Sequence, residues 1–208
     1  MRIWILIILM LASGTCAFGQ KYSRSQRGAT IDFYKEDITL TVSDSMASVA
    51  GIYWFRNPTE MHVPYPVSFP FYVDSTSLFP DSITAYVKED SLGKPLPAPV
   101  DIQIMKFKSQ NSIGIRVPIT AKGTTVWHLD YSQKILANHA RYILTSTAAW
   151  GRPLEDATYK FVVPVSYDSV QVWPIADTSY AQGDKKIYLC HKVNFMPKQD
   201  MEIFWKTK

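Results

Sequence analysis

Cysteine is almost absent from this chain of 208 residues, which contains only Cys16 and Cys190. Small exported domains are often held together by several disulfides, and two distant thiols exclude such a framework. The fold therefore has to be stabilised by its own hydrophobic core. Cys190 ends the apolar run Ile187–Cys190, a context that indicates a buried, inert thiol, and an intermolecular disulfide is the alternative.

Recognisable catalytic and cofactor motifs are also missing. There is no Gly-x-Ser-x-Gly elbow, no His-Glu-x-x-His pair, no phosphate-binding loop and no calcium-binding loop. The four histidines lack the spacing of metal ligands, and no basic stripe supports nucleic-acid binding. We therefore predict no catalytic residue, no metal site, no cofactor and no nucleic-acid partner. The histidines are His62, His128, His139 and His191.

An enzyme built from residues that are remote in sequence is the competing interpretation. His128 and Asp130 share one face of a predicted strand, so the carboxylate could orient the imidazole. A glycosidase could likewise combine dispersed carboxylates such as Glu155 and Asp156. This hypothesis of a secreted hydrolase predicts a concave cleft that contains at least two of these four side chains.

The first nineteen residues have the order of features that is typical of a secretory signal peptide. Arg2 supplies a positive charge and Ile3–Ala12 is an unbroken apolar run. Ala17 and Gly19 then provide the small side chains that signal peptidases require before a cut at Gln20. We therefore predict an exported protein that is periplasmic, cell-surface or extracellular.

Two other fates of this segment stay open. Cleavage before Cys16 and acylation of that thiol would give a lipoprotein, and an uncleaved segment would act as an anchor. No other window approaches the roughly twenty apolar residues that a membrane-spanning helix needs, so we expect no transmembrane span in the mature chain. The absence of an N-glycosylation acceptor fits a bacterial source.

Alternating apolar and polar residues dominate the rest of the chain. Ile38, Leu40 and Val42 alternate with polar residues, as in a strand with one buried face. Many short strands with Pro, Gly, Asp and Ser between them predict an all-β protein, an antiparallel β-sandwich. Strands are expected at 38–43, 46–55, 63–71, 83–87, 101–107, 112–117, 124–131, 140–144, 158–165, 169–173, 186–195 and 202–206.

Proline and glycine divide the chain near its middle. Gly93 and the prolines at 95, 97 and 99 predict a stiff connector, which could join two β units or cross over within one larger sandwich. We favour two packed β units. The expected segments are a signal peptide at 1–19, a flexible basic arm at 20–36, a first β unit at 37–90, a Pro-rich connector at 91–100 and a second β unit at 101–208.

Aromatic residues outside regular strands are the best candidates for ligand binding. Trp150 lies in a turn beside Arg152, where its ring could stack on a sugar or a partner side chain, or could instead plug the end of the sandwich. Tyr65 and Tyr72 belong to a Pro-rich extended segment that could form an aromatic platform or pack an edge strand. These four residues predict a non-catalytic binding or assembly module whose partner is a protein or a glycan.

Two stretches resemble secreted bacterial β-sandwich domains of uncharacterised function. Residues 46–70 contain a strand that ends in Phe55-Arg56-Asn57, followed by a strand with an aromatic-Pro motif, and the opening is similar to the vault/inter-α-trypsin type of domain. Residues 194–203 are similar to the closing strands of those families. The resemblance implies a β-sandwich and carries no catalytic residue or ligand. The Asp-x-Ser-x-Ser sequence that often accompanies the inter-α-trypsin type is absent.

Overall fold

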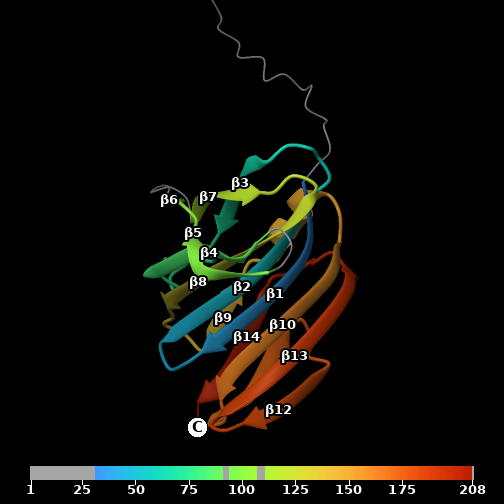
Figure 1. Ribbon diagram of the computed structural model, residues 1–208. Coiled ribbons are helices and arrows are strands. Elements are labelled where there is room, and N and C mark those ends of the chain that lie inside the picture. Colours follow the sequence, from blue (N-terminus) through green and yellow to red (C-terminus); the bar gives the residue numbers. More distant parts are fainter. Residues whose placement is uncertain (1–30, 91–93, 107–110, 208) are drawn as a thin grey trace, which may run out of the picture.

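The computed structural model describes residues 31–90, 94–106 and 111–207, and these residues form a β-sandwich (Figure 1). The expected signal peptide, Cys16 and residues 20–30 of the expected basic arm lie outside the described residues. In the described part of the chain, no helix is long and apolar enough to cross a membrane. The predicted all-β fold class is confirmed.

One layer of the sandwich is a sheet of eight strands with the order β12-β13-β10-β1-β2-β8-β4-β5. Figure 1 shows its long strands β1, β2, β10 and β13 side by side. The strands are β1 (Asp32–Val42), β2 (Met46–Asn57), β4 (Ser82–Glu89), β5 (Pro95–Asp101), β8 (Gly123–Lys134), β10 (Leu154–Pro164), β12 (Thr178–Gln182) and β13 (Lys185–Phe195).

The second layer consists of two separate three-stranded sheets, with the orders β11-β14-β9 and β3-β7-β6. Both cover the same face of the large sheet, because Tyr53 of β2 contacts Phe69 of β3 and bonds to Tyr142 of β9. The strands are β3 (Val63–Pro70), β6 (Ile104–Lys106), β7 (Ser112–Ile119), β9 (His139–Tyr142), β11 (Tyr167–Trp173) and β14 (Met201–Thr207).

A single hydrophobic core fills the space between the layers. The alternating apolar residues of β1, Ile38, Leu40 and Val42, point into it and are at most 1% exposed, as the sequence pattern predicts. Ile113 and Ile203 supply the opposite side from the two small sheets. Burial of this continuous core explains how the fold does without a disulfide framework.

Strand pairing differs in one place from the expected antiparallel arrangement. β1 runs parallel to β10, with Lys35 opposite Asp156 and Thr41 opposite Val162, while the other strand pairs are antiparallel among the described residues. The parallel pair joins segments more than one hundred residues apart, so no local turn signal could reveal it.

Several elements begin or lie where the sequence pattern suggests irregular chain. β1 begins at Asp32, so residues 32–36 of the expected arm are part of the central sheet. β5 occupies most of the expected connector, and its three prolines are tolerated because β5 is an edge strand. The large sheet contains strands from before and after residues 91–100 in the chain, and β8, which follows these residues, lies between β2 and β4, which precede them. A short 3-10 helix, η1 (Thr145–Trp150), precedes β10.

Candidate functional site

An open groove lies between the edge strand β3 and the helix η1. Tyr65, Pro66 and Val67 form the β3 wall, and Ala149 and Trp150 form the η1 wall. The groove stays open because no further strand pairs with the outer edge of β3. β3 is an edge of its sheet and carries prolines, which lack the N–H needed for another strand to pair.

The end of η1 fixes the position of the tryptophan. Gly151 follows Trp150 with φ +73°, a left-handed conformation that suits glycine, and its N–H bonds to the carbonyl of Ala148. A Cβ at Gly151 would meet no atom within 4 Å, so backbone conformation rather than space favours glycine here. The chain thus turns sharply after Trp150 and returns into β10.

Trp150 is half-buried and stands between the groove and the core. Its ring centroid is 5.2 Å from that of Phe55, 5.6 Å from that of Phe33 and 5.8 Å from that of Tyr65. The first two rings belong to the large sheet and the third belongs to β3. Trp150 therefore partly plugs the sandwich and also offers ring surface to the groove.

Behind Trp150 lies a small cavity inside the sandwich, which we call the aromatic cavity. The centre of a water molecule can occupy about 40 Å³ of it, enough for several waters or a small organic group. The wall carries serine and threonine hydroxyls and the carboxyl group of Glu36. Its aromatic lining consists of Phe33, Tyr53, Phe55, Phe69, Trp127, Tyr142 and Trp150.

Glu36 is the ionisable centre of the aromatic cavity. It lies on the inner face of β1, is 2% exposed, and accepts a hydrogen bond of 2.8 Å from the hydroxyl of Tyr159. Burial is the main cause that raises the pKa of Glu36 to about 7; the Tyr159 hydrogen bond opposes this shift, and the neighbouring charge of Asp37 adds a smaller upward contribution. A carboxyl group at this pKa changes charge near neutral pH.

Two tyrosine hydroxyls form a second polar contact in the same wall. The hydroxyls of Tyr53 and Tyr142 are 2.9 Å apart, and burial raises the pKa of both well above the usual value. The Tyr53 ring stacks on Trp127 with centroids 4.5 Å apart. The buried indole Nε1 of Trp127 has no hydrogen-bond partner among the residues that the structure describes.

Arg152, the second residue of the predicted site, is tied to a neighbouring charge. Its guanidinium lies 3.2 Å from Asp32, which also pairs with Arg56 at 3.3 Å. Arg56 in turn holds Glu155 with two bonds of 3.0 Å and lies 4.1 Å above the ring of Tyr34. Arg152 remains half exposed with one partner already in place, and it is not among the residues that line the groove.

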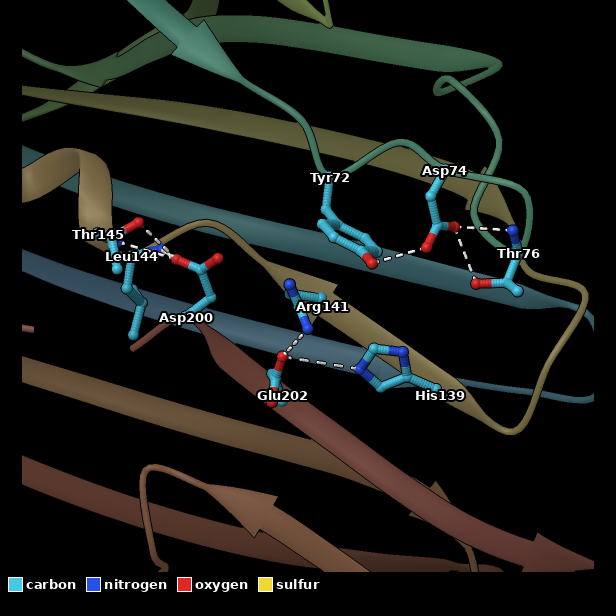
Figure 2. Close-up of polar contacts among 9 residues, drawn as sticks. All are labelled: Tyr72, Asp74, Thr76, His139, Arg141, Leu144, Thr145, Asp200 and Glu202. Carbon is cyan, nitrogen blue, oxygen red and sulfur yellow. Dashed lines mark hydrogen bonds and ion pairs between the residues drawn. The ribbon is translucent and has the colours of Figure 1, made fainter. Parts of the chain in front are cut away.

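Tyr72 lies apart from the groove, in a polar cluster over β9 and β14 (Figure 2). Its hydroxyl donates a 2.6 Å bond to Asp74, and its ring lies 4.2 Å below the guanidinium of Arg141. Asp74 also accepts bonds from Thr76, and the Tyr72 bond, together with these, holds the pKa of the Asp74 carboxyl well below the usual range. Tyr72 therefore orders the loop after β3.

The rest of this cluster is an ion pair on a sheet surface. Arg141 pairs with Glu202 on the next strand, and the ring of His139 stacks on Phe204 with centroids 4.2 Å apart. Asp200 accepts bonds from the backbone of Leu144 and from Thr145, which anchors the start of η1 to β14 (Figure 2). These contacts position η1 against the three-stranded sheet of β9 and β14.

The four residues of the hydrolase hypothesis form two groups, because His128 and Asp130 lie on β8 and share the partner Tyr86, whereas Glu155 and Asp156 belong to β10. Asp130 accepts a 2.6 Å bond from Tyr86, whose ring stacks on His128 on the same sheet face. Glu155 is held by Arg56 through two hydrogen bonds. None of these four side chains lines the groove or the cavity behind Trp150.

A histidine–carboxylate contact that the sequence did not reveal lies across β10 and β13. His191 Nε2 is 2.6 Å from Asp156, which also accepts a 2.7 Å bond from Lys35, and the lysine bond lowers the pKa of Asp156. The three side chains lie on a partly exposed sheet face. Within the described residues, no group of three metal-ligating side chains is close enough to hold a metal ion.

The structure thus brings together Tyr65 and Trp150 in one groove, whose lining includes neither Arg152 nor Tyr72. Sequence reasoning missed Glu36, although a signal for it exists. Glu36 is two residues before Ile38 in the same alternation, so a continued strand puts its carboxyl on the apolar face.

Comparisons with known proteins give no family assignment. No family model matches the sequence and no curated protein matches it. Among solved structures, the fold is similar to an M1 zinc metallopeptidase from Deinococcus radiodurans, with 11% identity, a TM-score of 0.49, and 85% of this chain and 42% of that chain covered. A mutant of that enzyme gives 13% identity, a TM-score of 0.47, and coverage of 86% and 43%. The chain spans less than half the length of these peptidase chains.

Proposed function

We propose that the chain is an exported, non-catalytic binding module that holds a protein partner in the groove between β3 and η1. One observation carries the proposal: Trp150 lines both the open groove and the aromatic cavity behind it. A half-buried tryptophan in such a place can exchange contacts with the core for contacts with a ligand. Tryptophan and tyrosine are the side chains that most often dominate binding energy at interfaces.

The groove chemistry favours a protein segment over a sugar. Its walls are proline rings, Tyr65, Val67, Ala149 and Trp150, and the polar groups are the hydroxyls of Ser68, Ser146 and Tyr65 and the indole N–H of Trp150. Sugars present many hydroxyl groups and need several planar polar side chains to bond with them. An extended, partly apolar protein segment can instead bury its side chains against these rings.

The proposed location rests on the sequence features at the N-terminus. The order of charge, apolar run and small residues in 1–19 supports export, with Gln20 or an acylated Cys16 as the first mature residue. Mass spectrometry of the mature protein distinguishes these two, because acylation adds the mass of the lipid chains and removes fewer residues.

Substitution of Trp150 is the direct test of the groove. We expect Trp150→Ala to weaken capture of the native partner by at least tenfold, measured by crosslinking in the envelope and then by titration of the purified partner. Phe204→Ala is the matched control, because Phe204 is also a partly exposed aromatic residue but lies on the β14 surface. It should leave capture unchanged.

Folding of both variants is checked by thermal unfolding, since Trp150 also packs on the core. Equal capture by wild type and Trp150→Ala, or loss only in Phe204→Ala, would reject the groove. If Trp150→Ala still captures the protein partner but loses binding to a glycan array, the ligand of the groove is a sugar and not a protein.

A further inference from the structure

The aromatic cavity has the composition of a site for a positively charged group. Aromatic rings carry negative charge on their faces, and several rings around one space attract a cation. Trp127 and Tyr53 present a stacked pair, while Phe33 stacks on Phe55 with centroids 5.1 Å apart and Trp150 closes the side toward the groove. The rings come from β1, β2, β8 and η1, so the sandwich itself holds them in place.

The charges around the cavity agree with this. Glu36 is the carboxyl group in the wall, and no lysine, arginine or histidine lines the cavity. The remaining ionisable groups that face Glu36 are the hydroxyls of Tyr53, Tyr142 and Tyr159, while the carboxyl of Asp37, next to it in β1, acts on Glu36 through its charge from the other face of the strand. None of these groups supplies a positive charge that would neutralise an ionised Glu36.

We infer that the aromatic cavity binds an organic ammonium group, which enters past Trp150 and pairs with the carboxylate of Glu36 between the aromatic rings. The inference rests on the proposed function, because it names the chemistry of the inner part of the same site. Either a lysine side chain of the partner or a free small amine could supply the ammonium group. The cavity is large enough for a head group of a few heavy atoms.

Proton balance makes the inference measurable. A neutral Glu36 gives its proton to water when the ammonium group enters, so the carboxylate and the ammonium form a neutral pair and one proton is released. With a pKa near 7, Glu36 is mostly protonated at pH 6 and mostly ionised at pH 8.5. Binding should therefore be about tenfold weaker at pH 6 than at pH 8.5.

The experiment is calorimetric titration of the full chain with n-butylammonium, in buffers of different ionisation enthalpy. We expect uptake by the buffer of about one proton per ligand at pH 6 and almost none at pH 8.5. The neutral analogue n-butanol should bind at least tenfold more weakly than n-butylammonium at pH 8.5. Equal binding of the alcohol, or no proton release at pH 6, would overturn the inference.

Variants locate the ammonium group. Glu36→Gln keeps an oxygen for the Tyr159 hydroxyl and should lose n-butylammonium binding and proton release together. Glu155→Gln, an exposed carboxyl held by Arg56, is the matched control and should change neither. If Glu36→Gln fails to fold, the comparison of alcohol with ammonium in the wild type still decides the inference.

A further ligand separates the two sources. If Nα-acetyl-lysine N-methylamide binds at least as tightly as n-butylammonium, the site takes a lysine side chain. If Nα-acetyl-lysine N-methylamide does not bind, the site takes a free amine. The outcome is independent of partner capture. Capture that depends on Trp150 without ammonium binding rejects only the inference, and ammonium binding without Trp150-dependent capture rejects only the proposed function.

Discussion

The hydroxyl of Tyr53 occupies the space that a side chain at Gly51 would fill. A Cβ built on Gly51 would lie 2.2 Å from the Tyr53 oxygen and 2.6 Å from the adjacent ring carbon. The two residues are neighbours on the inner face of β2, and the bare glycine lets the tyrosine ring lie flat along the strand. This position allows the hydroxyl to reach Tyr142 on the opposite layer.

Gly51→Ala should therefore destabilise the protein by about 1–3 kcal/mol, because the new methyl group forces the Tyr53 ring to move in a packed core. The expected sign is opposite to the usual gain of about 0.5–1 kcal/mol when alanine replaces glycine inside a strand. Urea unfolding measures the change. Gly123→Ala is the control, since its Cβ would meet the nearest atom at 3.5 Å, an ordinary contact. Equal stability of the two variants would contradict this packing.

Removal of either hydroxyl in the buried pair should have a similar effect. Tyr53→Phe and Tyr142→Phe each leave one buried hydroxyl without its observed partner, which costs about 1–3 kcal/mol of unfolding free energy. The double variant should lose less than the sum of the two single losses, because no orphan remains. A double-mutant cycle by urea unfolding measures this coupling, and strictly additive losses would show that the two hydroxyls do not interact.

Glu36 should make the protein less stable as the pH rises from about 4.5 to 7. The pKa of Glu36 is about 7 in the folded state against the ordinary value of 4.5 in an unfolded chain, so the folded state holds the extra proton in this range. Stability then falls by about 1.4 kcal/mol per pH unit, to a total of about 3 kcal/mol, and is constant above the folded pKa. The measurement is the difference in unfolding free energy between wild type and Glu36→Gln from pH 4 to 8.5.

Glu155→Gln provides a control of opposite sign. The hydrogen bonds from Arg56 lower the pKa of Glu155, so its contribution is present above the unfolded pKa and is lost as the pH falls. The effect should be small, because the Glu155 side chain is mostly exposed. A flat difference for Glu36→Gln across pH 4.5–7 would show that Glu36 is not desolvated.

The thiol of Cys190 should be unreactive in the folded protein. It is 0% exposed, and burial raises its pKa, so both access and thiolate formation are disfavoured. Labelling with Ellman's reagent should accelerate sharply above the urea midpoint, and the Cys190→Ser variant identifies the signal that belongs to this residue. Fast labelling of Cys190 in buffer would instead support the intermolecular disulfide as the alternative role.

The sequence could predict the strands whose side chains alternate and whose inner face is apolar. β2 and β8 follow that rule, and so does β1 from Ile38 onward. The alternation rule does not predict β12, because all five residues of β12 are exposed and the strand has no apolar face. The rule does not predict β5 either, because proline usually marks a turn or loop, whereas here it is accommodated in an edge strand.

The candidate site was harder to predict because it depends on contacts between distant segments. The loop position of Trp150 and the Pro-rich strand with Tyr65 are readable in the sequence, and the structure joins their rings. The aromatic cavity needs β1, β2, β8 and β9 together, and no local pattern specifies which strands will meet. Tyr72 illustrates the limit, since its place beside Arg141 follows from the long-range packing of the loop after β3.

The parallel pairing of β1 with β10 has a consequence for the order of folding. β1 lies inside the large sheet, with β2 on one side and β10 on the other, yet β10 enters the chain more than one hundred residues later. Until β10 is available, one whole edge of β1 stays without a partner and the loop between them remains to be closed. A nascent chain therefore cannot complete its core until β10 has been synthesised, even though β1 is the first strand of the sheet to appear.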